Sequence, residues 1–228
     1  MCGKFTAMAS WSEVVDFSDA LSATGGADSN DQLVTFRVMS QLPVIIFDRE
    51  QGKRRVVPMR WGFPRRGSWR SPDPIHARAE TIDSKPTFAD AFRDGQRGIV
   101  LVKTFNEAPD LPGKSEQHTI TPGDLSAIGI AFLWRRFEIA ELPAPLLACV
   151  MATVPANNLI ATLPTDRMPA ILANADWDTW LGENGASPDA AKACLKTVEG
   201  VKWTMTKEER AAKAQRAKPT VRDPGGLL

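Results

Sequence analysis

The residue of this sequence with the most distinctive chemistry is the cysteine at position 2. If Met1 is removed, the chain begins with Cys2, whose α-amine and thiol lie on adjacent carbon atoms. Such a pair captures aldehydes, because the amine forms an imine and the thiol then closes on the imine carbon to give a thiazolidine ring. An α-amine has a pKa of about 7.7–8.0 and keeps a useful neutral fraction near pH 7, whereas a lysine amine at about 10.4 does not. The alternative is that Cys2 is simply a small residue after the initiator.

A second group of chemically active residues lies between positions 76 and 81. Residues alternate there as in a strand, which predicts that His76, Arg78 and Glu80 share one face. Such a face suits a polar cleft, although a surface strand could also carry it. Farther along, Glu107 follows an apolar run and could be a carboxylate at a pocket edge that moves protons, or a solvated glutamate.

Arginine and aromatic residues are interleaved between positions 60 and 70. Guanidinium groups bind phosphates and aromatic faces stack on unpaired bases, so this composition is typical of single-stranded nucleic-acid recognition. The alternative is that Trp61 and Phe63 belong to the core while the arginines are solvated. The residues of this segment are Arg60, Trp61, Phe63, Arg65, Arg66, Trp69 and Arg70.

Composition narrows the class of protein. The 228 residues, 43% hydrophobic and 24% charged, predict one soluble domain with a sizeable core. The formal net charge of +1 gives no global polycation, so a nucleic-acid partner would need a local basic patch. Three cysteines without CxxC spacing and two distant histidines argue against a disulfide scaffold or a metal site. We therefore expect no cofactor, no membrane span and a reducing cytoplasm.

Short apolar runs bounded by turn residues predict many strands and few helices. The fold class expected is α+β, with a mainly antiparallel, barrel-like sheet and peripheral helices. Residues 1–205 are predicted to form one domain and residues 206–228 a basic tail, helical at first. The expected strands are 34–38, 44–47, 56–61, 98–102, 128–134 and 146–154, the expected helices 11–20, 88–92 and 176–181, and the expected loops 25–30, 60–74 and 108–115.

Five segments, in order along the chain, resemble the SOS-response-associated peptidase (SRAP) family of abasic-site processing proteins. They are similar to its MCGRF start, its WG-aromatic segment, its N-A-R-x-E-T stretch, a strand ending in glutamate, and its H-D-R-M-P-V-I-L motif. The resemblance runs from Cys2 to about Leu181. The segments here are Met1–Phe5, Trp61–Phe63, Ile75–Thr81, Gly98–Glu107 and Thr165–Leu172.

The resemblance implies a specific activity. Family members remove Met1 by self-processing, bind single-stranded DNA in a positively charged groove, and trap the aldehyde of an abasic site as a thiazolidine. Carried over by position, Cys2 would be the self-processing nucleophile and the DNA-linking residue, and Glu107 the acid/base group. Whether the protein is an enzyme is left open, and the activity considered is that of a cysteine autopeptidase, a hydrolase, with crosslinking or lyase activity on abasic DNA. The oligomeric state is also open.

The resemblance further implies a DNA-binding surface. Lys4 and Arg78 would hold phosphates flanking the lesion, and Trp69 or Phe63 would support the exposed base stack. In the arginine-rich segment, Arg65 and Arg66 would add to the basic surface. The neighbouring pair Asp166 and Arg167 would be structural, since an aspartate–arginine contact can fix a loop beside the site.

Two positions depart from the family pattern. His76 stands where the family has a catalytic asparagine, and Thr165 stands where it has a catalytic histidine. A histidine with a pKa near 6.5 can transfer a proton, so one hypothesis is that His76 takes over the missing role. Thr165 cannot act as an acid or base near neutral pH and is expected to be non-catalytic.

Three functions therefore stay open at the level of sequence. The first is an abasic-site crosslinker that loses Met1. The second is a catalytically altered relative that binds single-stranded nucleic acid, or a protein partner, without covalent chemistry. The third, weaker reading makes Cys2 an ordinary cysteine-hydrolase nucleophile whose thiol is activated by His76.

Overall fold

The computed structural model describes residues 2–7, 34–109, 116–123, 127–200 and 202–208. The helix expected at 11–20 and the loop at 25–30 lie outside the described residues. The strands are β1 (Lys4–Ala7), β2 (Val34–Arg37), β3 (Gln41–Asp48), β4 (Lys53–Trp61), β5 (Pro64–Arg65), β6 (Ser68–Pro72), β7 (His76–Arg78), β8 (Arg97–Glu107), β9 (His118–Thr121), β10 (Ile128–Phe137), β11 (Leu146–Pro155), β12 (Arg167–Pro169), β13 (Ile171–Leu172) and β14 (Thr204–Lys207). The helices are α2 (Ala89–Arg93), α3 (Trp177–Leu181) and α4 (Pro188–Ala193), with 3-10 turns η1 (Ala79–Thr81), η2 (Ile160–Thr162) and η3 (Asn174–Asp176).

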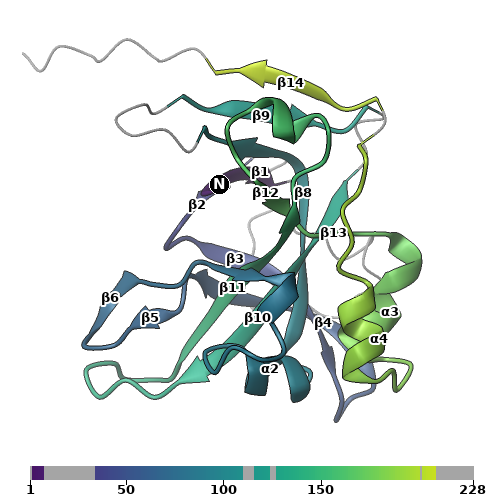
Figure 1. Cartoon of the computed structure of the whole chain (residues 1–228). Helices are drawn as coiled ribbons and strands as arrows, with labels where there is room; N and C mark the ends of the chain where they lie inside the picture. Colours follow the sequence, from purple (N-terminus) through teal and green to yellow (C-terminus); the bar gives the residue numbers. More distant parts are fainter. Residues whose placement is uncertain (1, 8–33, 110–115, 124–126, 201, 209–228) are drawn as a thin grey trace, which may run out of the picture.

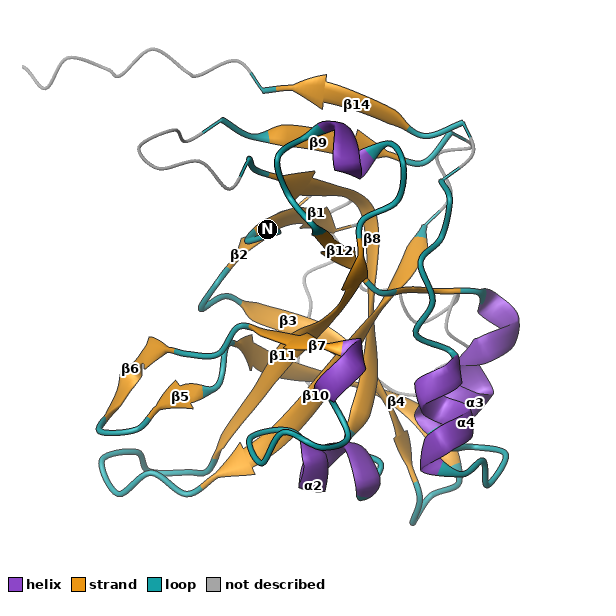
Figure 2. Ribbon diagram, viewed as in Figure 1, coloured by secondary structure: helices purple, strands orange, loops and turns teal. Residues whose placement is uncertain are grey.

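Five strands pair in a ring, so the centre of the fold is a closed barrel. β8 pairs with β10, β10 with β11, β11 with β4, β4 with β3, and β3 again with β8 (Figure 2). These pairings are antiparallel except that of β4 with β11. The expected mainly antiparallel, barrel-like α+β fold is confirmed. All the strands predicted from apolar runs are present, and β11 is central as its uninterrupted apolar sequence indicates, because it pairs with β4, β7, β10 and β12.

The N-terminal strand is fastened to this barrel by an aromatic cluster. Phe5 of β1 is fully buried, and its ring lies 4.9 Å from that of Trp61 and 6.5 Å from that of Phe132, measured between centroids. Aromatic pairs of this kind contribute about 0.5–1.5 kcal/mol each beyond the burial of their surface. The packing of Phe5 therefore fixes the position of Cys2, three residues earlier.

The helices lie outside the barrel, with α3 and α4 packed side by side on one flank and α2 near one end (Figure 1). The helix expected at 88–92 is α2, and that expected at 176–181 is α3. Arg97, at the start of β8, is 2% exposed and donates to the carbonyls of Phe92 and Trp180, which lie in the last turns of α2 and α3. Burial lowers the pKa of Arg97 to about 10. One buried cation thus caps two helices, which is favourable at helix C-termini.

We expect Arg97→Met to lower the free energy of unfolding by about 2–4 kcal/mol, because the methionine fills the volume but leaves two buried carbonyls without their donor. Urea unfolding followed by circular dichroism measures this. The matched control is Arg93→Ala, which removes an arginine that is 61% exposed and pairs with Asp90. A surface pair contributes less than about 1 kcal/mol, so the control should change little. Equal losses for the two variants would show that Arg97 does not serve as this cap.

The arginine-rich segment was expected to be a surface loop, and that prediction is wrong in one respect. Residues 64–72 form a two-stranded hairpin, β5–β6, which projects from the barrel (Figure 1). Its turn contains Gly67 at φ +83°, a left-handed conformation that glycine adopts without steric cost. At the base of the hairpin, Gly62 has φ +107°, and a β-carbon there would lie 2.4 Å from Pro72. Glycine at both positions therefore permits the hairpin.

The last described strand, β14, pairs with β9 and includes residues on both sides of the predicted boundary at 205/206. Thr206 and Lys207 lie in this strand, so the predicted helix does not begin there. No helix within the described ranges is long and apolar enough to span a membrane.

Candidate active site

Cys2 lies just before β1, which runs between β2 and β8. The side chain is 2% exposed, and its thiol donates to the carbonyl of Lys4, with Sγ 3.4 Å from the oxygen. Burial, reinforced by the charge of Glu107, raises the pKa of the Cys2 thiol far above its usual value. The thiol is therefore neutral at pH 7 in this conformation.

Glu107 ends β8 and is fully buried beside Cys2. Burial raises the pKa of the Glu107 carboxyl from 4.5 to about 7, and a hydrogen bond from the backbone of Cys2 opposes this shift without cancelling it. Near neutral pH, both the acid and its conjugate base are therefore populated. A carboxyl group with this pKa, in contact with the nitrogen side of Cys2, is suited to moving protons there. Glu107 is thus buried beside Cys2 and does not line either cavity described below, and its acid/base role stays a prediction.

His76, the first residue of β7, contacts Cys2 from another strand. Its Nε2 lies 2.6 Å from the carbonyl oxygen of Cys2. Because a carbonyl can only accept, Nε2 carries the hydrogen in this bond. The ring also packs edge-on against Trp61, with centroids 6.5 Å apart. Burial lowers the pKa of His76, so at pH 7 the ring is a neutral donor that fixes the carbonyl of Cys2.

This geometry does not favour the cysteine-hydrolase reading. That reading needs the His76 ring at the thiol, to draw off its proton. Instead Nε2 bonds to the carbonyl of Cys2, and the thiol donates to the carbonyl of Lys4. A thiol with a raised pKa is also a poor source of thiolate.

A cavity of about 270 Å³ opens beside His76. The strand prediction for 76–81 is correct for His76 and Arg78, which both line this cavity, but β7 ends at Arg78 and Glu80 lies in η1. Arg78 is exposed, as a phosphate-binding residue should be. Sequence reasoning missed Lys85, which also lines the cavity. Its position one helical turn before α2 could have indicated a second cation facing the same space.

An ion pair between Glu80 and Arg167 links the segment that follows β7 to β12. Arg167 is 6% exposed and donates to both carboxylate oxygens of Glu80, at 2.6 and 2.9 Å, and to the carbonyl of Thr153 at 2.6 Å. This hydrogen bonding lowers the pKa of the Glu80 carboxyl. The expected contact of Arg167 with Asp166 is wrong, because Asp166 is exposed and the carboxylate partner is Glu80. The contact is still structural, since it links η1, directly after β7, to β12.

Thr165 lies in the loop before β12, where its polar groups bond within its own segment. Its backbone N–H donates to the carbonyl of Leu163 at 2.7 Å, and its hydroxyl donates to the carbonyl of Arg167 at 3.5 Å. These bonds give Thr165 a role in shaping the loop.

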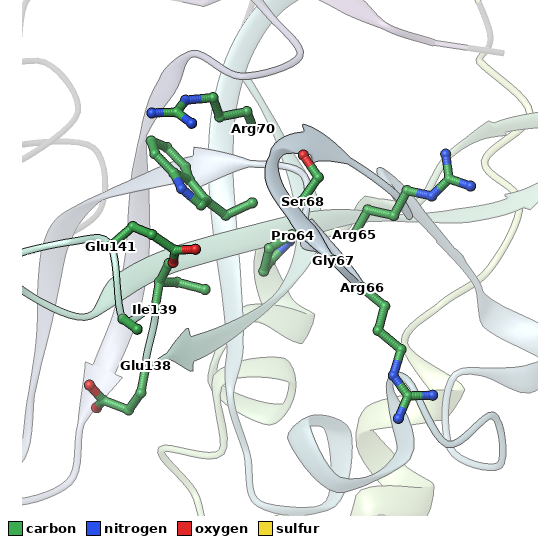
Figure 3. Close-up of a pocket in the computed structure, with 11 residues that line it drawn as sticks. Pro64, Arg65, Arg66, Gly67, Ser68, Arg70, Glu138, Ile139 and Glu141 are labelled. Carbon is green, nitrogen blue, oxygen red and sulfur yellow. The ribbon is translucent and has the colours of Figure 1, made fainter.

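The β5–β6 hairpin carries three more of the predicted DNA-binding residues, Arg65, Arg66 and Trp69, whereas Lys4 lies in β1. A cavity of about 460 Å³ lies between the hairpin and the loop after β10, and the side chains of Arg65 and Arg66 extend away from Glu138 and Glu141 there (Figure 3). Both arginines are exposed, and Trp69 is partly exposed with the Arg70 guanidinium 4.6 Å from its ring centroid. These positions suit contact with a nucleic acid.

Three members of the same segment belong to the interior. Trp61 and Phe63 are 0% and 2% exposed, so the expectation that Phe63 supports a base stack is wrong. Arg60 is 4% exposed and donates to the carbonyls of Trp69, at 2.6 Å, and Gly62, at 3.2 Å. Arg60 therefore fixes the hairpin from inside and does not contribute to its basic surface.

Together these features define a barrel protein whose candidate site is built on its second residue, with an acid at the nitrogen of that residue and a histidine at its carbonyl. The chain belongs to the SOS response associated peptidase (SRAP) family, whose model matches residues 1–211.

Relatives and solved structures agree with this assignment. The chain is 25% identical over 202 residues to the abasic site processing protein YoqW of Bacillus subtilis, covering 86% of this chain and 87% of that one. It is also 25% identical over 201 residues to the abasic site processing protein YoaM of the same organism, covering 86% of this chain and 85% of that one. A crystal structure of a protein from Bacteroides thetaiotaomicron shares the fold with a TM-score of 0.74 and 19% identity, covering 91% of this chain and 92% of that one. A crystal structure of a protein from Bordetella bronchiseptica shares the fold with a TM-score of 0.73 and 19% identity, covering 92% of this chain and 100% of that one.

Proposed function

We propose that this protein binds single-stranded DNA at abasic sites and, once Met1 has been removed, links itself to the lesion through a thiazolidine at Cys2. The observation that carries the proposal is the placement of Glu107 at the nitrogen side of Cys2 and of His76 at its carbonyl. The relatives named as abasic site processing proteins support the choice of lesion.

The proposed chemistry starts with hydrolysis of the Met1–Cys2 peptide bond, which consumes one water and frees the α-amine of Cys2. While that bond is intact, the nitrogen is an amide and cannot form an imine. Cleavage needs a proton on the departing nitrogen, and Glu107, with a pKa of about 7, is the adjacent group that can provide one. His76 Nε2–H holds the carbonyl of Cys2 and so orients its backbone.

In the second stage, the free amine attacks the aldehyde carbon of the ring-opened abasic sugar. Glu107 accepts a proton from the nitrogen and returns it to the departing hydroxyl, so one water leaves and an imine remains. The thiol of Cys2 then adds across the C=N bond, with its proton passing to the nitrogen. No further atom is lost, so the crosslink weighs one water less than the two partners together.

The cavity next to His76 and the projecting hairpin provide a proposed path for the DNA strand. Arg78 and Lys85 line the cavity next to His76, and Arg65, Arg66 and Trp69 lie on the projecting hairpin. Basic side chains that follow a backbone and an aromatic ring that stacks on a base are the usual elements of single-strand binding.

The experiment compares two single-stranded oligonucleotides, one with a natural abasic site and one with a tetrahydrofuran analogue that lacks the aldehyde. Protein shown by mass to have lost Met1 is incubated with each, and binding is measured before denaturing electrophoresis. We expect both to bind and only the aldehyde to give a shifted band. Binding without that band would overturn the covalent proposal.

Binding without a shifted band would support the other candidate function, that of a relative that binds single-stranded nucleic acid without covalent chemistry. The observation in favour of it is the hydroxyl of Thr165, which bonds to the carbonyl of Arg167 and cannot replace the family's histidine in proton transfer. The two candidates thus predict opposite outcomes with the same oligonucleotides.

For His76→Ala, we expect adduct formation to slow about tenfold at every pH between 6 and 8, because the variant loses a neutral donor to the carbonyl of Cys2. Initial rates at saturating DNA measure this. His76→Asn, which restores an amide donor of the kind the family carries, is the control and should recover part of the rate. If His76→Ala has the rate of the wild type across this range, neither positioning nor proton transfer by His76 contributes.

A further inference from the structure

Glu208, the residue directly after β14, places its carboxylate among three donors from other strands. Nζ of Lys4 lies 2.8 Å from Oε1 and 2.9 Å from Oε2, and Nδ2 of Asn106 lies 2.8 Å from Oε1. The hydroxyl of Thr119 donates to Oε1 at 3.2 Å. These contacts, with that of Lys4 the largest, lower the pKa of Glu208, so the carboxylate is charged at pH 7.

The strands that carry the three donors pair with one another without a contribution from Glu208. Lys4 is registered opposite Asn106 between β1 and β8, and Asn106 opposite Thr119 between β8 and β9. Paired residues on neighbouring strands present their side chains on the same face, so the three lie side by side. Asn106 is 1% exposed, and its Nδ2 also donates to the hydroxyl of Thr119 at 3.0 Å, which orients that hydroxyl to donate onward.

A cationic amine, an amide N–H and a hydroxyl that converge on one point form a site for an oxyanion. The ends of the ion pair remain accessible, since the side chains of Lys4 and Glu208 are 23% and 32% exposed. An anion from solution can therefore reach the donors when Glu208 leaves. Glu208 is held by its backbone N–H, which donates to the carbonyl of Gln117 at 2.8 Å, and this bond continues the β9–β14 ladder beyond the strand.

We infer that Lys4, Asn106 and Thr119 form a phosphate-binding site that the chain fills with its own Glu208 carboxylate, and that a backbone phosphate of the bound nucleic acid displaces this carboxylate. The identity of the ligand rests on the proposed binding of DNA. Lys4 lies two residues after Cys2 in the sequence, and Asn106 lies directly before Glu107, so the site is built on β1 and β8, the same strands that position Cys2 and Glu107. Glu208 acts as an intramolecular competitor of the substrate.

The site is separate from the chemistry itself. Asn106 and Glu107 are successive residues of β8, so their side chains point to opposite faces of the strand. Loss of the Glu208 carboxylate should therefore change DNA affinity and leave the rate of adduct formation at saturating DNA unaltered.

The test compares Glu208→Gln with Glu116→Gln, which removes a carboxylate paired with Lys207 at 2.8 Å nearby and changes the net charge by the same amount. We expect Glu208→Gln to bind a single-stranded oligonucleotide about fivefold more tightly at low salt, with the slope of log affinity against log salt steeper by about 0.7, the value for one added phosphate contact. Glu116→Gln should leave the slope unchanged. Adding Lys4→Ala to Glu208→Gln should cancel the gain. Equal slopes for the two glutamate variants would overturn the inference.

A second measurement does not depend on DNA binding. Inorganic phosphate is titrated into the wild type and Glu208→Gln while the side-chain amide signal of Asn106 is followed by NMR. The signal should shift with saturation in Glu208→Gln and stay in place in the wild type. An unshifted signal in Glu208→Gln would disprove the site even if the protein crosslinks DNA, and a shift would support it even if the protein does not.

Discussion

Replacing Cys2 with serine is expected to reduce the covalent adduct on abasic DNA to background while noncovalent binding to the same strand persists. A hydroxyl in place of the thiol cannot add to the imine with comparable nucleophilicity, so the reaction stops at a bond that water reverses. Serine is close in size to cysteine, so the packing of this buried site is largely conserved. Denaturing electrophoresis of both proteins with the abasic oligonucleotide measures the difference.

The matched control for Cys2→Ser is Cys194→Ala. Cys194 is also a buried free cysteine, 6% exposed, and its thiol donates to the carbonyl of Ala190 in α4, the helix that it follows. Loss of that thiol should leave the adduct yield unchanged. If Cys2→Ser gave the same yield as the wild type, the aldehyde would be captured by another nucleophile, and the account of Cys2 would be wrong.

Replacing Glu107 with glutamine has the second large effect. We expect adduct formation to slow by about 10²–10⁴-fold, the usual contribution of a positioned acid or base, because the amide has the shape of the carboxyl but does not titrate. The wild-type rate should show an inflection from Glu107, whose pKa is raised by burial, in addition to the one from the Cys2 α-amine, and the variant should lose the Glu107 inflection. A variant that keeps this inflection would show that another group is responsible for it.

The same substitution should change stability with a definite sign. The Glu107 carboxyl has a pKa raised from 4.5 to about 7, so the folded chain binds a proton more tightly than the unfolded chain between these values. The free energy of unfolding should therefore fall as pH rises through this window and remain low above it. At pH 8 the shift corresponds to about 3 kcal/mol, which Glu107→Gln should recover. Urea unfolding at pH 5 and pH 8 measures the difference between the two proteins.

Much of the fold follows from the sequence because the barrel strands have a simple pattern. Residues 98–102 and 146–154 are continuous apolar runs between turn residues, and they became parts of β8 and β11, which are buried in the barrel. The closure of the barrel was harder to predict from the sequence, because it depends on long-range strand pairings such as that of β8 with β10, which no local pattern specifies. The hairpin at 64–72 was missed because its Gly, Pro and Arg content is that of a loop.

The candidate site was predictable in its residue types and less so in its contacts. Cys2 and Glu107 were placed together by resemblance, and the β1–β8 pairing brings them into contact. Arg60 was misread because the sequence does not distinguish a buried arginine from a solvated one, and the partner of Arg167 was misassigned because Glu80 lies 87 residues away along the chain. Only the folded chain shows that Arg60 bonds to the carbonyl of Trp69 and Arg167 to Glu80.

The contact of Glu208 with Lys4 could also not be predicted from the sequence. Glu208 lies 204 residues from Lys4 along the chain, in a segment predicted to be a basic tail. The pairing of β14 with β9 is what carries this carboxylate to the N-terminal strand.

The central claim is tested most directly by intact mass spectrometry of the protein after incubation with a single-stranded abasic oligonucleotide, followed by mapping of the linked peptide. We predict a species with the mass of the chain without Met1 plus the oligonucleotide minus one water, and a linkage that maps to Cys2. A chain without Met1 that binds this oligonucleotide but gains no mass, or gains it at a lysine, would contradict the account.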